Sequence, residues 1–347
     1  MHINVFTKFL LASLLFSPFY LAQEVEIISG GNERSFRINL PSNTDEPIPL
    51  MFILHGLGES SASWYGVASY IKNQGFATVR PESGTFLSNT GSSYVKLWNA
   101  ILDSNRYDDV QFISDIIDYM LINYDFIDHD KIYVLGFSNG GYMAYRLACD
   151  LGYRIAAFTS IAGNMFLDDD GFDCIDQSRD IPILHVHGTE DPINSYYPGG
   201  NGVDILDDQY LTIIESIDFW SNYHNYDIMQ IDTILTNVSV RKVYSNNSSL
   251  STFEHIQVIG GGHYYFYGDN YGFSSSQEAI DFSSQYELSD FIANDEDTDD
   301  NGLFNIDDIN VVVAYLLDFN DSNDQFDFNS DQNIDIFDVL TLSDIIY

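Results

Sequence analysis

Short apolar runs alternate with longer segments of helical periodicity through the middle of the chain. The runs are rich in β-branched residues, as buried strands are. They occupy residues 50–54, 132–135, 156–161, 181–186 and 253–259. Apolar positions with helical spacing predict helices over residues 110–124 and 140–151. Because alternating strands and helices imply a mostly parallel sheet with helices on both faces, the pattern predicts the α/β class.

Two further stretches differ from this alternation. Residues 25–28 and 35–40 have the pattern of strands with no helix between them, so we expect an antiparallel pair at the edge of the sheet. Residues 83–107 show no clear period, and we expect an irregular loop over the functional site.

An apolar stretch near the N-terminus stands apart from the sheet pattern. Lys8 precedes a run over residues 9–22 that two serines and a proline interrupt. This run is too short and too broken to span a bilayer stably, but it suits the core of a signal peptide. We therefore predict a signal peptide over residues 1–22 and a secreted, extracellular protein.

Charge divides the chain and excludes some partners. The sequence carries 13 basic against 52 acidic residues, a formal charge of -39. Nucleic acid and anionic membrane both require a basic face, so we exclude both as partners; the acidity also fits a saline habitat. No lysine or arginine occurs after residue 293. This change in composition marks a boundary between a domain of residues 23–293 and a second domain of residues 294–347.

The strand at residues 132–135 leads into a Gly-x-Ser-x-Gly sequence formed by residues 136–140. A serine on a sharp turn between strand and helix needs small residues two positions before and after it, because the turn brings backbone segments close together. The turn lifts the hydroxyl above the sheet, and the N-terminus of the following helix favours negative charge developing beside it. We therefore predict that Ser138 is a nucleophile.

A serine nucleophile requires a base, and the base requires an acid that orients it. After a strand-turn-helix serine of this kind, the acid and the histidine follow in that order. Asp191 comes after the strand at residues 181–186, at the carboxyl end where sites form. We predict Asp191 as the acid, with its neighbour Glu190 as the alternative, and we expect His187 to be structural.

A loop of three glycines carries the candidate base. Residues 260–262 are glycines that follow the last predicted strand and precede His263. A glycine-rich loop can bend to bring this histidine back over Ser138. His224 and His255 compete for the role, although His255 lies within a predicted strand, where a structural role is more common. We predict His263 as the base.

Acyl transfer also requires donors for the oxyanion of the tetrahedral intermediate. The sequence Leu-His-Gly-Leu-Gly at residues 54–58 follows the strand at residues 50–54, which is the position of the oxyanion loop beside a serine of this type. We predict that the backbone N–H groups of Leu57 and Asn139 form the oxyanion hole, and that His55 braces the loop.

These motifs together resemble the esterase family that contains feruloyl esterases, acetylxylan esterases and secreted polyhydroxybutyrate depolymerases. The resemblance extends over roughly residues 45–270 and includes LHGLGES, WNA, GFSNGGYMAYRLACD, HGTEDPI and GGGH. It implies an α/β-hydrolase fold and catalysis by Ser138, Asp191 and His263 without a cofactor.

The resemblance also implies roles outside the triad. Trp98 and Trp220 match tryptophans of the family and would bind substrate. Cys149 and Cys174 lie where many relatives have a disulfide, and an exported chain permits such a bridge. Relatives often carry further cysteines near both tryptophans, and this chain has none there, so we expect the rim of the site to differ.

The acidic segment 294–347 contains a repeat of oxygen-bearing side chains. Oxygen ligands at loop positions 1, 3, 5 and 12, with a carbonyl at position 7, form the shell that calcium requires. The first loop would use Asp297, Asp299, Asn301, Leu303 and Asp308, and the second Asp327, Asn329, Asp331, Asn333 and Asp338. The repeat resembles a type I dockerin, a small all-α module that binds calcium and docks enzymes onto cohesin-bearing scaffolds. We expect two calcium sites, with Gln332 in place of the usual glycine in the second loop. The resemblance implies a cohesin partner, and calcium binding without such a partner is the alternative.

The motifs lead to one principal function and two alternatives. We expect a secreted serine esterase that hydrolyses feruloyl or acetyl esters of xylan through an acyl-enzyme. The same machinery serves a polyhydroxybutyrate or related polyester depolymerase, and residues 83–107 and 193–215 would distinguish the two. The third hypothesis is a non-catalytic binding module with the same fold, which the complete triad and oxyanion loop disfavour.

Overall fold

The computed structural model describes residues 22–44, 47–87, 94–165, 180–199, 211–268 and 270–291. The predicted signal peptide, apart from its last residue, and the predicted dockerin-like module lie outside these residues. The leader, the two calcium loops and the cohesin partner therefore stay predictions. Within the part of the chain that is described, no helix is long and apolar enough to cross a membrane.

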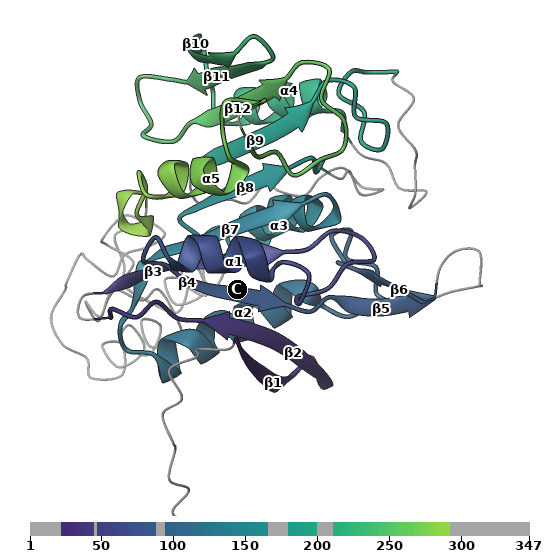
Figure 1. Cartoon of the computed structure of the whole chain (residues 1–347), viewed down its shortest axis with the longest axis vertical. Helices are drawn as coiled ribbons and strands as arrows, with labels where there is room; N and C mark the ends of the chain where they lie inside the picture. The colour runs from purple at the N-terminus through teal and green to yellow at the C-terminus, as the bar shows by residue number, and fades with distance from the viewer. Residues whose placement is uncertain are drawn as a thin grey trace, which may run out of the picture.

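A ten-stranded sheet forms the centre of the described part of the molecule (Figure 1). Its strands lie in the spatial order β1 (Gln23–Ser29), β2 (Asn32–Asn39), β4 (Ala77–Pro81), β3 (Ile48–Leu54), β7 (Ile127–Phe137), β8 (Ala157–Ile161), β9 (Ile183–Gly188), β12 (Phe253–Val258), β11 (Ser239–Ser245) and β10 (Ile228–Thr236). The six strands from β4 to β12 run parallel, and antiparallel strands extend the sheet at both ends. A separate hairpin consists of β5 (Gly84–Leu87) and β6 (Tyr94–Leu97).

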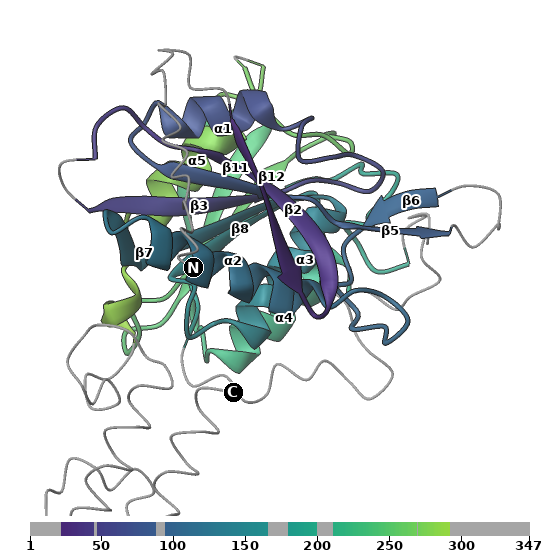
Figure 2. The same ribbon diagram turned by 90° about the horizontal axis from the view of Figure 1, so that it is seen from below.

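Helices cover both faces of the sheet, as Figure 2 shows. One face carries α1 (Tyr65–Lys72) and α5 (Ser275–Ser283), and the other carries α2 (Asp109–Asn123), α3 (Asn139–Asp150) and α4 (Ile213–Tyr223). A short 3-10 helix (Leu288–Asp290) follows α5. Each face has its own cluster of buried apolar side chains, so a central strand such as β9 is buried along its whole length.

Most of the predicted elements are present. The strands expected at residues 50–54, 132–135, 156–161, 181–186 and 253–259 correspond to β3, β7, β8, β9 and β12. The two expected helices correspond to α2 and α3. The expected edge pair is confirmed, because β1 and β2 pair antiparallel with Val25 opposite Phe36.

The prediction of an irregular loop over residues 83–107 was wrong in part. The segment contains the hairpin of β5 and β6. Each of these strands has four residues, which is too short for an alternation to be recognised in the sequence. β10 and β11 gave no clear signal either, because β11 is only partly buried over most of its length.

A buried ion pair joins the edge of the sheet to α2. Nη2 of Arg34 lies 2.6 Å from Oδ1 of Asp109, and both side chains are almost fully buried. The other carboxylate oxygen of Asp109 accepts the backbone N–H of Asn99 at 2.7 Å. The guanidinium lies over the ring of Phe112, 3.9 Å from its centroid. Asp109 therefore connects β2, α2 and the segment that carries Trp98.

Replacing Asp109 by alanine is expected to lower the free energy of unfolding by about 3–5 kcal/mol, since the charge of Arg34 would stay buried without its partner. Urea denaturation followed by circular dichroism measures this loss. The control is Asp118→Ala on the same helix, where an exposed aspartate pairs with Arg154 and the expected loss is under about 1 kcal/mol. Equal losses of unfolding free energy in the two variants would contradict the prediction that the buried ion pair stabilises the fold more than the exposed one.

Candidate active site

Ser138 lies on the turn between β7 and α3 in a strained backbone conformation. Its φ and ψ angles are 53° and -120°, a region that costs a non-glycine residue about 1–3 kcal/mol. The flanking glycines let the turn close. A Cβ at Gly136 would lie 2.0 Å from the carbonyl oxygen of Gly140, and one at Gly140 would lie 2.2 Å from that of Leu54. The Gly-x-Ser-x-Gly sequence is therefore a packing requirement that holds the hydroxyl at the N-terminus of α3.

The structure brings Ser138, Asp191 and His263 together, although long stretches of sequence separate them. Nε2 of His263 lies 2.9 Å from Oγ of Ser138, and Nδ1 of His263 lies 2.8 Å from Oδ2 of Asp191. The three residues follow β7, β9 and β12, which end at the same edge of the sheet. The loops after β9 and β12 pass very close, since a Cβ at Gly188 would lie 2.1 Å from the carbonyl oxygen of Gly261.

Asp191 is buried, and N–H groups surround its carboxylate. Oδ1 accepts the backbone N–H groups of Ile193 at 2.8 Å and Asn194 at 2.9 Å. Oδ2 lies 2.8 Å from Nδ1 of His263 and 3.2 Å from Nε2 of His187. Burial acts to raise the pKa of Asp191, but the hydrogen bonds from His187 and His263 outweigh it and hold that pKa well below its ordinary value. The carboxylate is therefore ionised at neutral pH and able to orient an imidazole.

The competing acid and bases lie in other surroundings. Glu190 is exposed to solvent. His224 follows α4, and its Nδ1 lies 2.6 Å from Oδ1 of Asp180. His255 is buried in β12, where its Nδ1 faces a backbone carbonyl oxygen at 3.0 Å. The geometry therefore favours Asp191 as the acid and His263 as the base.

The predicted oxyanion loop follows β3 and is held on both sides of Leu57. The N–H of Gly56 donates to Oε2 of Glu59 at 2.8 Å. The N–H of Gly58 donates to the carbonyl oxygen of Lys96 at 2.9 Å, so β6 supports the loop directly. These bonds fix the backbone around the predicted donor, and its role in binding an oxyanion stays a prediction.

Asn139, the second predicted donor, is tied to the same loop. It is the first residue of α3, so its N–H has no acceptor within the helix. Its Oδ1 accepts the backbone N–H of Trp98 at 2.8 Å, and the indole Nε1 of Trp98 donates to the carbonyl oxygen of His55 at 2.9 Å. The two segments that would form the oxyanion hole are therefore linked through one tryptophan.

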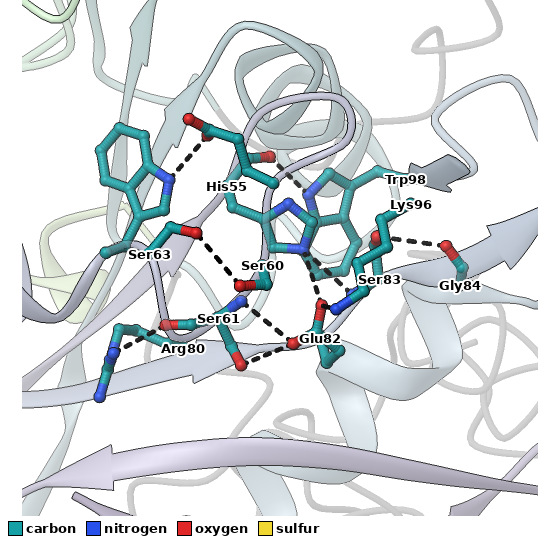
Figure 3. Close-up of polar contacts among 12 residues, drawn as sticks. His55, Ser60, Ser61, Ser63, Arg80, Glu82, Ser83, Gly84, Lys96 and Trp98 are labelled. Atoms are coloured by element: carbon teal, nitrogen blue, oxygen red, sulfur yellow. Dashed lines mark hydrogen bonds and ion pairs between the residues drawn. The ribbon is translucent and has the colours of Figure 1, made fainter. Parts of the chain in front are cut away.

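Glu82 lies at the centre of the polar network that supports the predicted oxyanion loop (Figure 3). Its Oε2 accepts the N–H and hydroxyl of Ser61 at 3.1 and 2.7 Å, and its Oε1 lies 2.7 Å from Nζ of Lys96. Burial acts to raise the pKa of Glu82, yet the bonds from Lys96 and Ser61 outweigh it and lower that pKa. Burial lowers the pKa of His55, and Nε2 of its ring accepts the N–H of Ser83 at 3.3 Å. These contacts agree with a bracing role for His55.

Comparison with known proteins identifies the fold. Residues 39–207 match the family described as phospholipase/carboxylesterase. An acetyl xylan esterase from Aspergillus awamori has a similar structure, with a TM-score of 0.50 and 18% sequence identity over 70% of this chain and 94% of that chain. This chain has the α/β-hydrolase fold. An S-formylglutathione hydrolase from Agrobacterium tumefaciens is also similar, with a TM-score of 0.50 and 13% identity over 75% of this chain and 94% of that chain.

Curated relatives share sequence with part of this chain. A bifunctional acetylxylan esterase/xylanase from Neocallimastix patriciarum is 32% identical over 172 residues, which are 48% of this chain and 22% of that protein. A probable feruloyl esterase C from Aspergillus niger is 28% identical over 198 residues, which are 54% of this chain and 63% of that protein. The chain thus spans less than two thirds of the length of these two relatives.

The structure corrects the substrate-binding role expected for Trp98 and Trp220. The exposed fractions of Trp98 and Trp220 are 1% and 0%. Trp98 supports the predicted oxyanion loop, and Trp220 packs in α4 against the rings of Tyr145 and His224. Neither indole has a face open to a ligand, because both belong to the core behind the site.

The predicted disulfide involves a residue outside the described part of the chain. Cys149 lies in α3 and is partly buried, whereas Cys174 falls outside the described residues, so the bridge stays a prediction. The same holds for the calcium ligands between Asp297 and Asp338. Where the structure is described, no group of three or more histidine, cysteine or acidic side chains is arranged to hold a metal ion.

The contact between His187 and the acid was not expected from the sequence. His187 was expected to be structural, yet its ring lies beside the carboxylate of Asp191, and hydrogen bonds continue from it through His185 to Tyr145. A signal was present in the sequence. Residues two apart on a strand share a face, so His185 and His187 face the same side of β9 just before the acid.

Proposed function

We propose that this protein is a serine esterase that hydrolyses feruloyl or acetyl esters of plant cell-wall polysaccharide through an acyl-enzyme. The observation that carries this proposal is the hydrogen-bonded series from Ser138 through His263 to the buried, ionised Asp191. A serine hydroxyl becomes a nucleophile beside a base that an acid orients. The three groups lie at one edge of one sheet, and Ser138 is only partly buried there, so its hydroxyl can reach a substrate.

Each group of the triad has a separate role. Oγ of Ser138 attacks the ester carbonyl carbon while Nε2 of His263 takes its proton. The bond to the alcohol oxygen breaks as the imidazolium gives that proton to the leaving group. Asp191 keeps Nδ1 of His263 protonated and stabilises the imidazolium. Water then attacks the acyl-enzyme with His263 as base, which releases the acid and restores the serine. No step requires a cofactor.

The N–H groups of Leu57 and Asn139 would stabilise the tetrahedral intermediate. Negative charge develops on the carbonyl oxygen as Ser138 attacks, and each preorganised donor is typically worth about 3 kcal/mol in the transition state. The braced loop after β3 and the N-terminus of α3 hold the two donors at fixed positions. Little reorganisation is therefore needed when the oxyanion forms.

The relatives support the substrate class. Both an acetylxylan esterase/xylanase and a feruloyl esterase share sequence with this chain. The leader predicted over residues 1–22 would place the enzyme outside the cell, where such polysaccharide occurs. The calcium loops predicted within residues 294–347 would attach it to a cohesin-bearing scaffold.

A panel of esters tests the proposal. The purified full-length protein is incubated with methyl ferulate, acetylated xylan, feruloylated arabinoxylan and polyhydroxybutyrate film, and the released acids are measured by chromatography. We expect ferulate or acetate to be released faster than hydroxybutyrate. Release from the polyester alone would indicate a depolymerase, and no release from any ester would leave only a binding module. Calcium retained after dialysis is measured in parallel, and its absence would refute the proposed role of the tail.

A further inference from the structure

Three histidines lie buried beneath the acid of the triad. His185 and His187 belong to β9 and His255 to the neighbouring β12, and none of the three is exposed to solvent. Buried polar groups require hydrogen-bond partners. The partners here include a continuous series that ends at Asp191, and the esterase mechanism proposed above assigns no role to it.

The position of each proton in the series follows from the acceptors. Nε2 of His187 lies 3.2 Å from Oδ2 of Asp191 and 3.1 Å from the carbonyl oxygen of Asn194. An ionised carboxylate and a carbonyl only accept, so this Nε2 carries a proton and donates it. In a neutral ring, Nδ1 of His187 then accepts from Nε2 of His185, 3.1 Å away. Nδ1 of His185 accepts in turn from the hydroxyl of Tyr145 at 2.6 Å.

Burial keeps the remote members of the series uncharged. It lowers the pKa of His185 well below its ordinary value, and the neighbouring His187 and His255 act in the same direction. Burial also raises the pKa of the Tyr145 hydroxyl well above its ordinary value. Tyr145 therefore keeps its proton, His185 carries a single proton, and every donor points toward Asp191. Hydrogen bonds aligned in one direction polarise one another, which strengthens the last of them.

We propose that His187, supported by His185 and Tyr145, is a positioning residue for the acid of the triad; this inference rests on the proposed esterase function. His187 acts through Asp191 and touches no substrate. Two backbone N–H groups fix Oδ1 of the carboxylate and two imidazoles fix Oδ2. Without His187, Oδ2 loses one of its donors and the carboxylate can tilt about its Cβ–Cγ bond. The imidazole of His263 is then no longer held at the nucleophile.

Four variants separate positioning from structural support. His187→Leu removes the donor and replaces the imidazole by an apolar side chain of moderate size. His187→Gln places an amide N–H close to the lost Nε2–H. Tyr145→Phe removes the remote end of the series. Tyr196→Phe is the matched control, because Tyr196 is also buried and its hydroxyl lies 2.8 Å from Nε2 of His255, outside the series.

With p-nitrophenyl acetate as substrate, His187→Leu is expected to lower kcat by about 100-fold with little change in KM, since a slightly displaced catalytic group costs that much. His187→Gln should restore most of the loss. Tyr145→Phe should lower kcat by about threefold, and Tyr196→Phe should leave it unchanged. Wild-type kcat in a folded His187→Leu protein would overturn the inference. If that variant does not fold, equal values of kcat in Tyr145→Phe and Tyr196→Phe would overturn it instead.

A second measurement does not depend on turnover. Nitrogen-15 NMR of histidine-labelled protein reports which ring nitrogen carries the proton. We expect His187 as the Nε2–H tautomer, and we expect the Nδ1–H signal of His263 to move in His187→Leu but to stay in His187→Gln. An Nδ1–H tautomer at His187 would overturn the inference. If the wild-type protein hydrolyses no ester, the proposed function fails, and this spectrum still decides whether His187 donates to Asp191.

Discussion

Replacing Ser138 by alanine is expected to lower kcat for ester hydrolysis by about 10⁶-fold, because the acyl-enzyme can no longer form. The fold should be kept, since the serine hydroxyl is bonded to the imidazole of His263 and not to the core. Residual hydrolysis would come from water attacking an ester held in the oxyanion loop. Turnover of methyl ferulate and labelling by a fluorophosphonate probe both measure the loss.

The control for this variant is Ser114→Ala, which removes a serine hydroxyl far from the triad. Oγ of Ser114, on α2, accepts a hydrogen bond from Nη1 of Arg154 at 2.8 Å. This protein should turn over and take up the probe like the wild type. A Ser138→Ala protein that lost less than about tenfold in kcat would mean that a different residue attacks the ester.

The central strands could be predicted because both of their faces are buried. β3 consists almost entirely of buried residues, so it appears in the sequence as a continuous apolar run. β4 is also fully buried, but its sequence ATVRP includes an arginine and a proline and has no such run. β11 lies near one end of the sheet, where partial burial goes with a mixed composition. The apolar pattern therefore does not reveal strands that contain polar side chains, even where such a strand is buried.

The members of the candidate site could be predicted because topology decides where strand ends lie. Ser138, Asp191 and His263 each follow a parallel strand, and parallel strands end at one edge. The donors around the carboxylate depend on loop conformation, which no local pattern describes. The same is true of the ion pair between Glu82 and Lys96, because it joins a loop to a hairpin that the sequence did not reveal.

The tryptophans show a related limit. A resemblance places Trp98 and Trp220 in the sequence but says nothing of their exposure, and both prove to be buried. Asn99 is buried next to the first of them because its amide donates to the carbonyl oxygens of Asp103 and Tyr107, at 3.1 and 3.0 Å. A polar residue next to a tryptophan in the sequence therefore does not show that the tryptophan is exposed, because backbone carbonyl groups can bind the polar side chain in the interior.

Replacing Asp191 by asparagine is expected to lower kcat/KM at neutral pH by about 10⁴-fold. Oδ1 of the new side chain would keep the backbone N–H groups of Ile193 and Asn194. Its amide NH₂ would then take the place of Oδ2, which Nδ1 of His263 and Nε2 of His187 both face. Because donors would meet donors, His263 would carry its proton on Nε2 instead. A protonated Nε2 is unable to take the proton of the serine.

The pH dependence of stability provides a second readout of Asp191→Asn. In the wild type, the pKa of Asp191 is held below its ordinary value, which is about 3.9 in an unfolded chain. A depressed pKa contributes stability that is present above the unfolded value and is lost as pH falls through the lower folded value. The difference in unfolding free energy between wild type and Asp191→Asn should therefore be constant near neutral pH and shrink in acid. A difference that grew in acid would contradict the assigned direction.

A double-mutant cycle connects this prediction to the histidine beneath the acid. Since His187 acts only through the carboxylate, adding His187→Leu to Asp191→Asn should lower kcat/KM little further, whereas independent sites would multiply their losses. The exposed neighbour supplies the control, and Glu190→Gln should behave like the wild type. If Asp191→Asn kept its activity within about tenfold, the carboxylate would not be the group that holds the imidazole. If the two losses multiplied, His187 would serve the enzyme by a route that does not pass through Asp191.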